Sequence, residues 1–121
     1  MLTLPASTKI FLCTEVADMR RGFDGLAAMT REIIGADPLS GHLFVFRNRR
    51  HDRMKVLYWD RDGFALWYKR LERGTFRFPA PGEGAHSVEI DHATLTLILE
   101  GIDVRGARRQ QRFQRTSRLM A

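Results

Sequence analysis

The sequence lacks the features that mark several large protein classes. Its single cysteine, Cys13, excludes an internal disulfide and suits a reducing compartment. No apolar run approaches the ~18 residues that a membrane-spanning helix needs. The opening stretch MLTLPASTKIFLCTE has no basic start ahead of a long apolar segment, so it does not resemble a signal peptide. We therefore expect a cytoplasmic protein that does not contact a membrane.

Recognisable catalytic and metal-binding patterns are also missing. The four histidines are scattered, and no Cys or His pair has the spacing of a zinc site. The chain has no G-x-S-x-G elbow and no glycine-rich phosphate loop. Asp60 and Asp62 in WDRDG resemble a metal-binding carboxylate pair, which leaves a metal-dependent nuclease as a less favoured alternative. Turn and helix-cap roles explain both aspartates more simply, so we expect no enzyme activity, no cofactor and no metal.

Acidic residues are absent after Asp103, and this gives the sequence its charge asymmetry. The 121 residues carry a formal net charge of +6. The last 17 residues hold six arginines, whereas bases and acids balance over residues 1–104. We therefore predict a single globular domain over 1–104 and a basic, flexible tail over 105–121. A body of mixed charge with a basic arm is typical of proteins that bind polyanions, although a basic tail can also be merely solubilising.

A second basic cluster lies between two apolar runs, in FVFRNRRHDRMKVLYWD. Four arginines and one aspartate give this link a net charge of +3. It is either a solvated loop or a clamp for nucleic acid, whose phosphates the planar guanidinium group binds with paired hydrogen bonds. The predicted nucleic-acid-binding residues are Arg47, Arg49, Arg50 and Arg53 of this link, Lys69, Arg70 and Arg73, and the tail residues Arg105, Arg108, Arg109, Arg112 and Arg115.

The first half of the chain predicts one strand, one helix and a hairpin. KIFLC is short and apolar, which favours a strand. Asp18 is placed to cap a helix whose apolar periodicity continues to Ile34, with Gly35 at its end. HLFVF and MKVLYW then predict two strands joined by the arginine-rich link. Both are nearly continuous apolar runs, so both faces of this hairpin should be covered.

The second half is less decisive. In GFALWYKRLERG, apolar residues at i, i+3, i+4 and i+7 favour a helix capped by Asp62, with a strand as the alternative because aromatic residues also favour strands. Thr75–Phe78 predicts a short strand, and SVEI an extended segment. Asp91 should cap a last helix that ends near Gly101. The expected fold is a small α+β domain of order β-α-β-β-α-β-α with an antiparallel hairpin.

Four segments together carry a resemblance to a known family: DMRRGFDGLAAM, DPLSGHLFVFRNRR, MKVLYWDRDGFALWYKRLERGTFRFP and LILEGIDVRGARR. They are similar to TnpB, or Orf2, the accessory protein of the IS-sixty-six class of bacterial insertion sequences. The resemblance runs from about Asp18 to Arg109. It implies a role in DNA transposition beside a separate transposase, and it carries no catalytic residues. The RNA-guided nuclease that shares the name TnpB is a different, larger protein.

Two partner hypotheses follow. In the first, the chain binds DNA without catalysis, with phosphate contacts from the hairpin tip and the tail. In the second, LWYKRLE presents an aromatic or arginine anchor to the transposase or to a sister accessory protein. Trp59, Trp67, Tyr58 and Tyr68 could stack on bases, but packing in the core is the favoured reading of these aromatic side chains.

Overall fold

A computed structural model describes residues 5–102 and 112–113 of the chain. Its regular elements are five strands, two α-helices and one π-helical turn. They are β1 Ile10–Cys13, α1 Phe23–Met29, the π-helical turn η1 Thr30–Ile34, β2 Leu43–Arg47, β3 Arg53–Asp60, β4 Gly63–Arg70, β5 Ser87–Ile90 and α2 His92–Glu100. The predicted α+β class with an antiparallel hairpin is confirmed.

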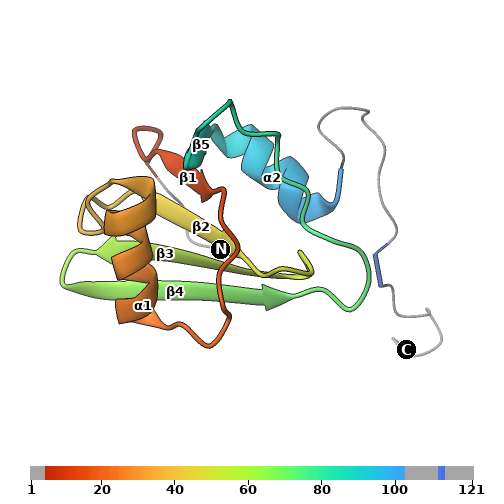
Figure 1. Ribbon diagram of the computed structural model, residues 1–121, viewed down its shortest axis with the longest axis horizontal. Helices are drawn as coiled ribbons and strands as arrows, with labels where there is room; N and C mark the ends of the chain where they lie inside the picture. Colours follow the sequence, from red (N-terminus) through yellow and green to blue (C-terminus); the bar gives the residue numbers. More distant parts are fainter. Residues whose placement is uncertain (1–4, 103–111, 114–121) are drawn as a thin grey trace.

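The five strands form one mixed sheet in the order β4-β3-β2-β1-β5. β1 and β2 are parallel and are connected through α1, whereas β2, β3 and β4 form an antiparallel meander. β5 then returns to the other side of β1 in the antiparallel direction. Figure 1 shows α1 crossing in front of β3 and β4, while α2 lies at the opposite side of the sheet, near β5 and β1.

The sheet is covered on both faces, and each face has its own apolar core. On one face, Phe44, Phe46 and Leu57 pack with α1 residues such as Leu26 and with Cys13. On the other face, strand residues pack with α2 and with the segment that follows β4; the buried members include Leu12, Val45, Met54, Val56, Phe76, Leu95 and Ile98. The continuous apolar runs of β2 and β3 are thereby explained, because alternate side chains enter different cores.

Both helices end as the sequence predicts, but only the second begins as predicted. Gly35 and Gly101 take left-handed conformations at φ +76° and +77°, which glycine adopts without steric penalty. The Asp91 carboxylate accepts the Thr94 N–H at 2.7 Å, as an N-cap should. The predicted cap at Asp18 is wrong, since α1 begins at Phe23 after Gly22 and the Asp18 carboxylate binds Arg20 instead.

The helix predicted over 63–74 is also wrong, because Gly63–Arg70 is strand β4. β4 pairs with β3 along its whole length, from Asp60↔Gly63 to Arg53↔Arg70. Asp62 is therefore a turn residue and not a helix cap. The spacing of Phe64, Trp67, Tyr68 and Leu71 fits a helical period. However, aromatic residues also favour strands, and pairing with β3 provides hydrogen-bond partners for the N–H and C=O groups on that side of β4. The strand, which the sequence analysis gave as the alternative for this segment, is the correct assignment.

The segment after β4 crosses the second face without forming a strand. Thr75–Phe78, predicted as a short strand, has no ladder partner within the described residues. Its Phe76 side chain is nevertheless fully buried. The segment 71–78, which we name the strap, is held by single backbone hydrogen bonds to the β2–β3 loop, as shown below.

Candidate nucleic-acid interface

The loop between β2 and β3, residues 48–52, is organised by one asparagine. Asn48 Oδ1 accepts the N–H groups of Asp52 at 3.1 Å and Arg53 at 3.0 Å. Its Nδ2 donates to Asp52 Oδ1 at 2.7 Å. These hydrogen bonds join the two ends of a loop that is wider than a two-residue turn. The loop therefore holds a defined shape while its tip projects into solvent.

Arg49 and Arg50 form that tip, and both are exposed. Within the part of the chain that the structure describes, neither side chain forms a hydrogen bond or an ion pair with protein. Guanidinium groups held in solvent without a protein partner retain all their donors for a ligand. Among the residues predicted to contact phosphate, Arg49 and Arg50 are thus exposed and have their donors available, as such a contact requires.

The strap braces the loop from behind. The Leu71 N–H donates to the Asp52 carbonyl at 2.8 Å, and the Phe76 N–H donates to the His51 carbonyl at 2.7 Å. His51 adopts φ +61°, a left-handed conformation uncommon for a residue with a side chain. Burial, together with the nearby Arg47 charge, lowers the pKa of His51. Both effects favour the neutral form of the imidazole.

Arg47 takes a structural position although it belongs to the predicted set. Its Nη1 donates to the Phe76 carbonyl at 2.9 Å, and the guanidinium lies 4.1 Å from the centroid of the Phe78 ring. Burial lowers the pKa of Arg47, because the charged form loses hydration. The side chain is half-buried and fixes the strap to the end of β2, so its geometry favours anchoring over phosphate contact.

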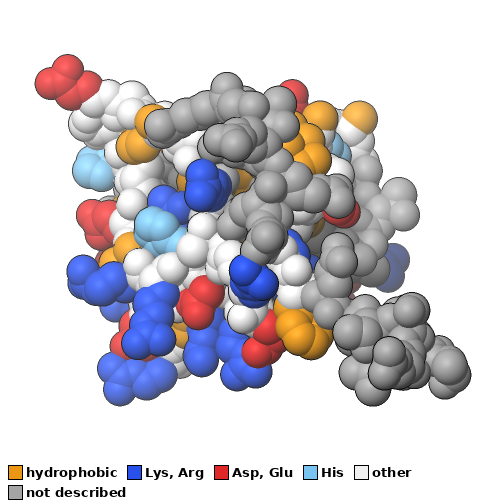
Figure 2. Space-filling view, turned by 90° about the vertical axis from the view of Figure 1, so that its right-hand side faces the viewer, with side chains coloured by type: hydrophobic (Ala, Val, Ile, Leu, Met, Phe, Trp, Pro, Cys, Tyr) orange, Lys and Arg blue, Asp and Glu red, His pale blue; other side chains and the backbone are white. Residues whose placement is uncertain are grey.

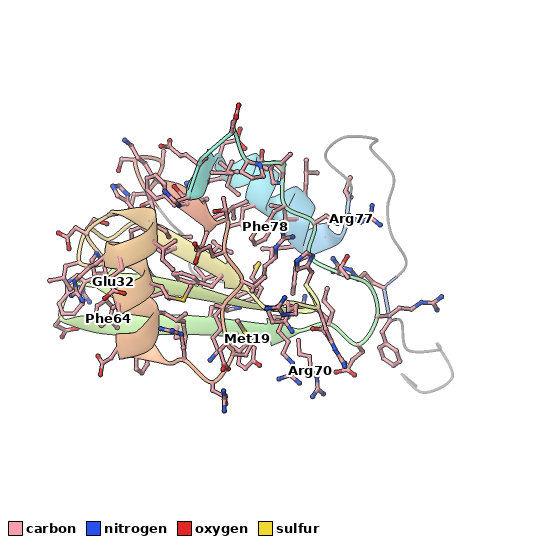
Figure 3. The ribbon with its side chains drawn as sticks, in the orientation of Figure 1. Met19, Glu32, Phe64, Arg70, Arg77 and Phe78 are labelled. Atoms are coloured by element: carbon pink, nitrogen blue, oxygen red, sulfur yellow. The ribbon has the colours of Figure 1, made fainter. Side chains whose placement is uncertain are left out.

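Two predicted arginines meet at the end of the β3–β4 pair. Arg53 and Arg70 are direct cross-strand partners, so their side chains leave the sheet on the same face. Arg53 Nη1 donates to Tyr68 Oη at 3.3 Å, and Arg70 forms an ion pair with Glu72 at 2.9 Å. Figure 3 shows Arg70 at the C-terminal end of β4, apart from Arg77 on the side of α2. The adjacent Lys69 is exposed on the opposite face, and Arg73 is an exposed residue of the strap.

An open groove of about 700 Å³ lies beside the loop tip. It runs between the segment 15–21 and the loop, and its apolar lining includes Val16, Met19, Met29 and Ile33. Its charged lining consists of Arg21, Arg49, Arg50, Arg53, Glu15, Asp18 and Asp52. Figure 2 shows Lys and Arg side chains gathered along the lower left of this end of the molecule, with acidic side chains between them. The arginines exceed the acids by one, so the surface is basic but of mixed charge.

The segment 15–21 is held in place by a lysine that the sequence analysis missed. Lys55 is only 6% exposed, and its Nζ donates to the carbonyls of Met19 and Arg21, both at 2.8 Å. The ammonium also lies 4.7 Å from the centroid of the Tyr68 ring. The signal was a lysine inside the apolar run MKVLYW, where a charge must find partners. Lys55 positions one wall of the groove.

Asp18 carries a second ion pair beside the groove. Its carboxylate accepts the Arg20 N–H at 2.8 Å and lies 2.6 Å from the Arg20 guanidinium. These hydrogen bonds lower the pKa of Asp18 to about 2. Both side chains are solvent-exposed, so the pair shapes the local turn and contributes little to global stability.

One tail arginine lies against the body of the protein. Arg112 donates to the carbonyls of Leu99 at 3.1 Å and Thr75 at 3.2 Å, and its guanidinium lies 5.6 Å from the Phe76 ring centroid. Burial lowers the pKa of Arg112. A cation at the carboxyl end of α2 also complements the helix dipole. Arg105, Arg108, Arg109 and Arg115 lie outside the described residues, so their phosphate contacts stay predictions.

Among residues 5–102 and 112–113, no group of three or more His, Cys, Asp or Glu side chains is arranged to hold a metal ion. Asp60 precedes the β3–β4 turn and Asp62 is the second residue of that turn, at the opposite end of the hairpin from Arg53 and Arg70. Cys13 is a free, buried thiol whose pKa is raised by burial. The helices of the described part are too short or too polar to span a membrane.

Comparison with known proteins identifies relatives along nearly the whole chain. The family model described as IS66 Orf2 like protein matches residues 8–109. The uncharacterized protein y4hO of Sinorhizobium fredii is 40% identical over 105 residues, which cover 87% of this chain and 90% of that protein. The uncharacterized protein y4jC of the same organism is 39% identical over 95 residues, covering 78% and 80%. No solved structure matches the chain.

Proposed function

This chain belongs to the IS66 Orf2-like family of transposition accessory proteins, and we propose that it assists transposition by binding DNA without catalysing a reaction. The contact surface consists of four arginines at one end of the sheet. They are Arg49 and Arg50 at the loop tip and Arg53 and Arg70 at the strand ends. Phosphate oxygens are the ligand that this arrangement suits best.

The observation that carries the proposal is the direct pairing of Arg53 with Arg70. Like charges directly opposite each other on neighbouring strands destabilise a sheet, and Glu72, which pairs with Arg70 at 2.9 Å, supplies one negative charge against two positive ones. Two further exposed arginines, Arg49 and Arg50, lie nearby and have no hydrogen-bond or ion-pair partner among the residues that the structure describes. A polyanion would relieve this repulsion, because each phosphate neutralises a guanidinium and releases a counterion.

The surface favours phosphate contact over base reading. It is formed by a loop and by strand ends, and no described helix presents arginines in a row that would enter a major groove. We therefore expect binding that depends steeply on salt and weakly on sequence. Preference for the ends of an insertion sequence would then come from the transposase or from a second site.

The test is a fluorescence-anisotropy titration of the full chain on a short labelled duplex at several salt concentrations. The double variant Arg49→Ala/Arg50→Ala should bind more weakly. Its slope of log affinity against log salt should be shallower by about 2, because each lost phosphate contact removes ~0.9. Arg31→Ala, an exposed arginine of η1, is the matched control and should bind as the parent does.

Charge substitution is a better test than removal of residues 105–121. Deleting the tail also removes the contacts of Arg112 with the end of α2 and with the Phe76 ring, so it removes packing contacts and charge together. Equal binding by the parent and the Arg49/Arg50 variant would overturn the assignment of this surface. Absence of binding at low salt, with retained copurification of the transposase after nuclease treatment, would support the partner hypothesis instead.

A further inference from the structure

Strand β4 is a long, apolar edge of the sheet. It occupies the first position in the order β4-β3-β2-β1-β5, and among the described strands it pairs only with β3. It has eight residues, whereas the opposite edge, β5, has four. Figure 1 shows β4 as the outermost strand along the lower side of the sheet. A short edge strand offers few backbone groups for pairing with another chain. A long, mostly apolar edge strand without proline offers many.

The side chains of β4 support this reading. Tyr68 is 47% exposed, and Phe23 at the start of the neighbouring helix α1 is 49% exposed. Phe64, Leu66 and Trp67 are only partly buried although they belong to the two cores. A further strand beside β4 would cover these side chains on both faces.

The hairpin geometry fixes which backbone groups of β4 point outward. Asp60 and Gly63 close a two-residue turn, so this pair exchanges hydrogen bonds. Ala65, Trp67 and Lys69 then also face β3. The N–H and C=O groups of Phe64, Leu66 and Tyr68 point away from the sheet. Over the described part of the chain, the backbone hydrogen bonds outside the ladders include none from these residues.

We propose that β4 pairs antiparallel with β4 of a second copy of this chain, centred on Leu66. In this register Leu66 faces Leu66, and four further pairs lie on each side of it. Phe64 faces Tyr68, Ala65 faces Trp67, Gly63 faces Lys69, and Asp62 faces Arg70. Small residues stand opposite large ones, and the acidic turn stands opposite the basic strand end.

Alternative registers are less favourable. Because only alternate residues have outward backbone groups, the register can change only by two residues at a time, so that residues with outward groups stay opposite each other. One such shift sets Lys69 opposite Arg61, although it also sets Arg70 opposite Asp60. The other sets Arg70 opposite Phe64 and Asp62 opposite Glu72. The register centred on Leu66 is thus the one that sets Asp62 of each copy opposite Arg70 of the other. Any antiparallel pairing of two identical strands is two-fold symmetric, so the pairing closes as an isologous dimer.

The dimer does not rest on the DNA-binding proposal, and its test contains no DNA. The mass of the nuclease-treated full chain is measured by sedimentation equilibrium over a range of concentrations. We expect twice the 14.0 kDa of one chain. Asp62→Arg and Arg70→Asp should each raise the dimer dissociation constant at least tenfold, because each places like charges in the interface. The double variant should restore the dimer.

Glu89→Arg makes the same charge change on the other edge strand and serves as the control; it should leave the mass unchanged. A chain that is monomeric at all concentrations, or a double variant that stays as weak as the single ones, would overturn the proposal. Circular dichroism of each variant separates loss of pairing from loss of folding.

A cysteine at position 66 tests the register itself. In a hydrogen-bonded antiparallel pair the two Cα atoms lie ≈ 5.5 Å apart, a distance that a disulfide spans. Leu66→Cys should therefore give a disulfide-linked dimer on mild oxidation. Lys69→Cys, which faces Gly63 in this register, should not. Equal cross-linking of both variants would contradict the register, and the native Cys13 is buried and does not compete.

Discussion

The two turns of the β2–β3–β4 meander differ in length, charge and support. The loop 48–52 is wide, carries Arg49 and Arg50, and is held by Asn48 and by two hydrogen bonds from the strap. The β3–β4 turn has only two residues, follows Asp60, and within the described residues has no backbone hydrogen bond from the strap. The β3–β4 pair thus has positive charge at the end near the loop 48–52, which the strap supports, and negative charge at the end with the two-residue turn.

This difference shows where sequence alone is a weak guide. A tight turn needs only its own backbone, whereas a wide loop with solvent-facing arginines keeps one shape only if distant residues support it. Those residues lie far from the loop in sequence. The following variants test how far the two ends differ.

The largest effect is expected at Phe76, the residue of the strap that lies deepest. Phe76→Ala should lower the free energy of unfolding by about 3–5 kcal/mol, because a fully buried aromatic ring leaves a cavity. Urea denaturation measures this change. Phe23→Ala is the comparison, since this exposed ring should cost less than about 1 kcal/mol. Equal losses would mean that the strap is not part of the core.

Lys55 should show the next largest effect. Lys55→Met keeps the length of the side chain but leaves the carbonyls of Met19 and Arg21 without their donor. We expect a loss of about 2–3 kcal/mol in the free energy of unfolding. Lys69→Met, on the neighbouring strand and exposed, should be close to neutral. A neutral Lys55→Met would show that the segment 15–21 needs no anchor.

The pH dependence of Asp18 should be smaller. Its pKa is lowered to about 2 from 3.8, so the stabilisation is present above the unfolded value and is lost as the pH falls from about 4 to 2. The melting temperature of Asp18→Asn should therefore differ most from that of the parent above pH 4. The two should converge near pH 2. A constant difference over this range would contradict the ion pair with Arg20.

The smallest effect is expected at the tight turn. Arg61 adopts φ +56°, which strains any residue with a Cβ atom. Arg61→Gly should raise the free energy of unfolding by no more than about 0.5 kcal/mol, because relief of strain is partly offset by the greater freedom of glycine in the unfolded chain. His51→Gly provides the parallel at the braced loop. At His51 the gain in the free energy of unfolding should be cancelled, because the substitution also removes the packing of the partly buried imidazole.

Local patterns predicted much of the fold. The hairpin of β2 and β3, the cap at Asp91 and the glycine ends of both helices follow from residues close together in sequence. The segment 63–74 was misread because its helical spacing and its strand-favouring composition disagree, and only pairing with β3 decides between them. Composition was the better guide, since its aromatic residues suit a strand with both faces covered.

The site was harder to predict than the fold. Arginine composition located the loop tip, but it could not distinguish Arg49 from Arg47, whose guanidinium is held by the Phe76 carbonyl. In the same way, Arg112 resembles its tail neighbours in sequence and yet lies against α2. Which arginine is available depends on burial by segments about 10 to 40 residues away, and no local pattern contains that information.

The strap has a consequence for motion. Phe76 donates its N–H to His51, accepts a hydrogen bond from Arg47 at its carbonyl, and lies beneath Arg112 with its ring. Its amide belongs to no helix or strand, but it can exchange its hydrogen with solvent only when the loop separates from the strap. The Leu71 amide is held in the same way by Asp52. These two amides should therefore show one common free energy of opening in hydrogen exchange, as reporters of a single cooperative opening.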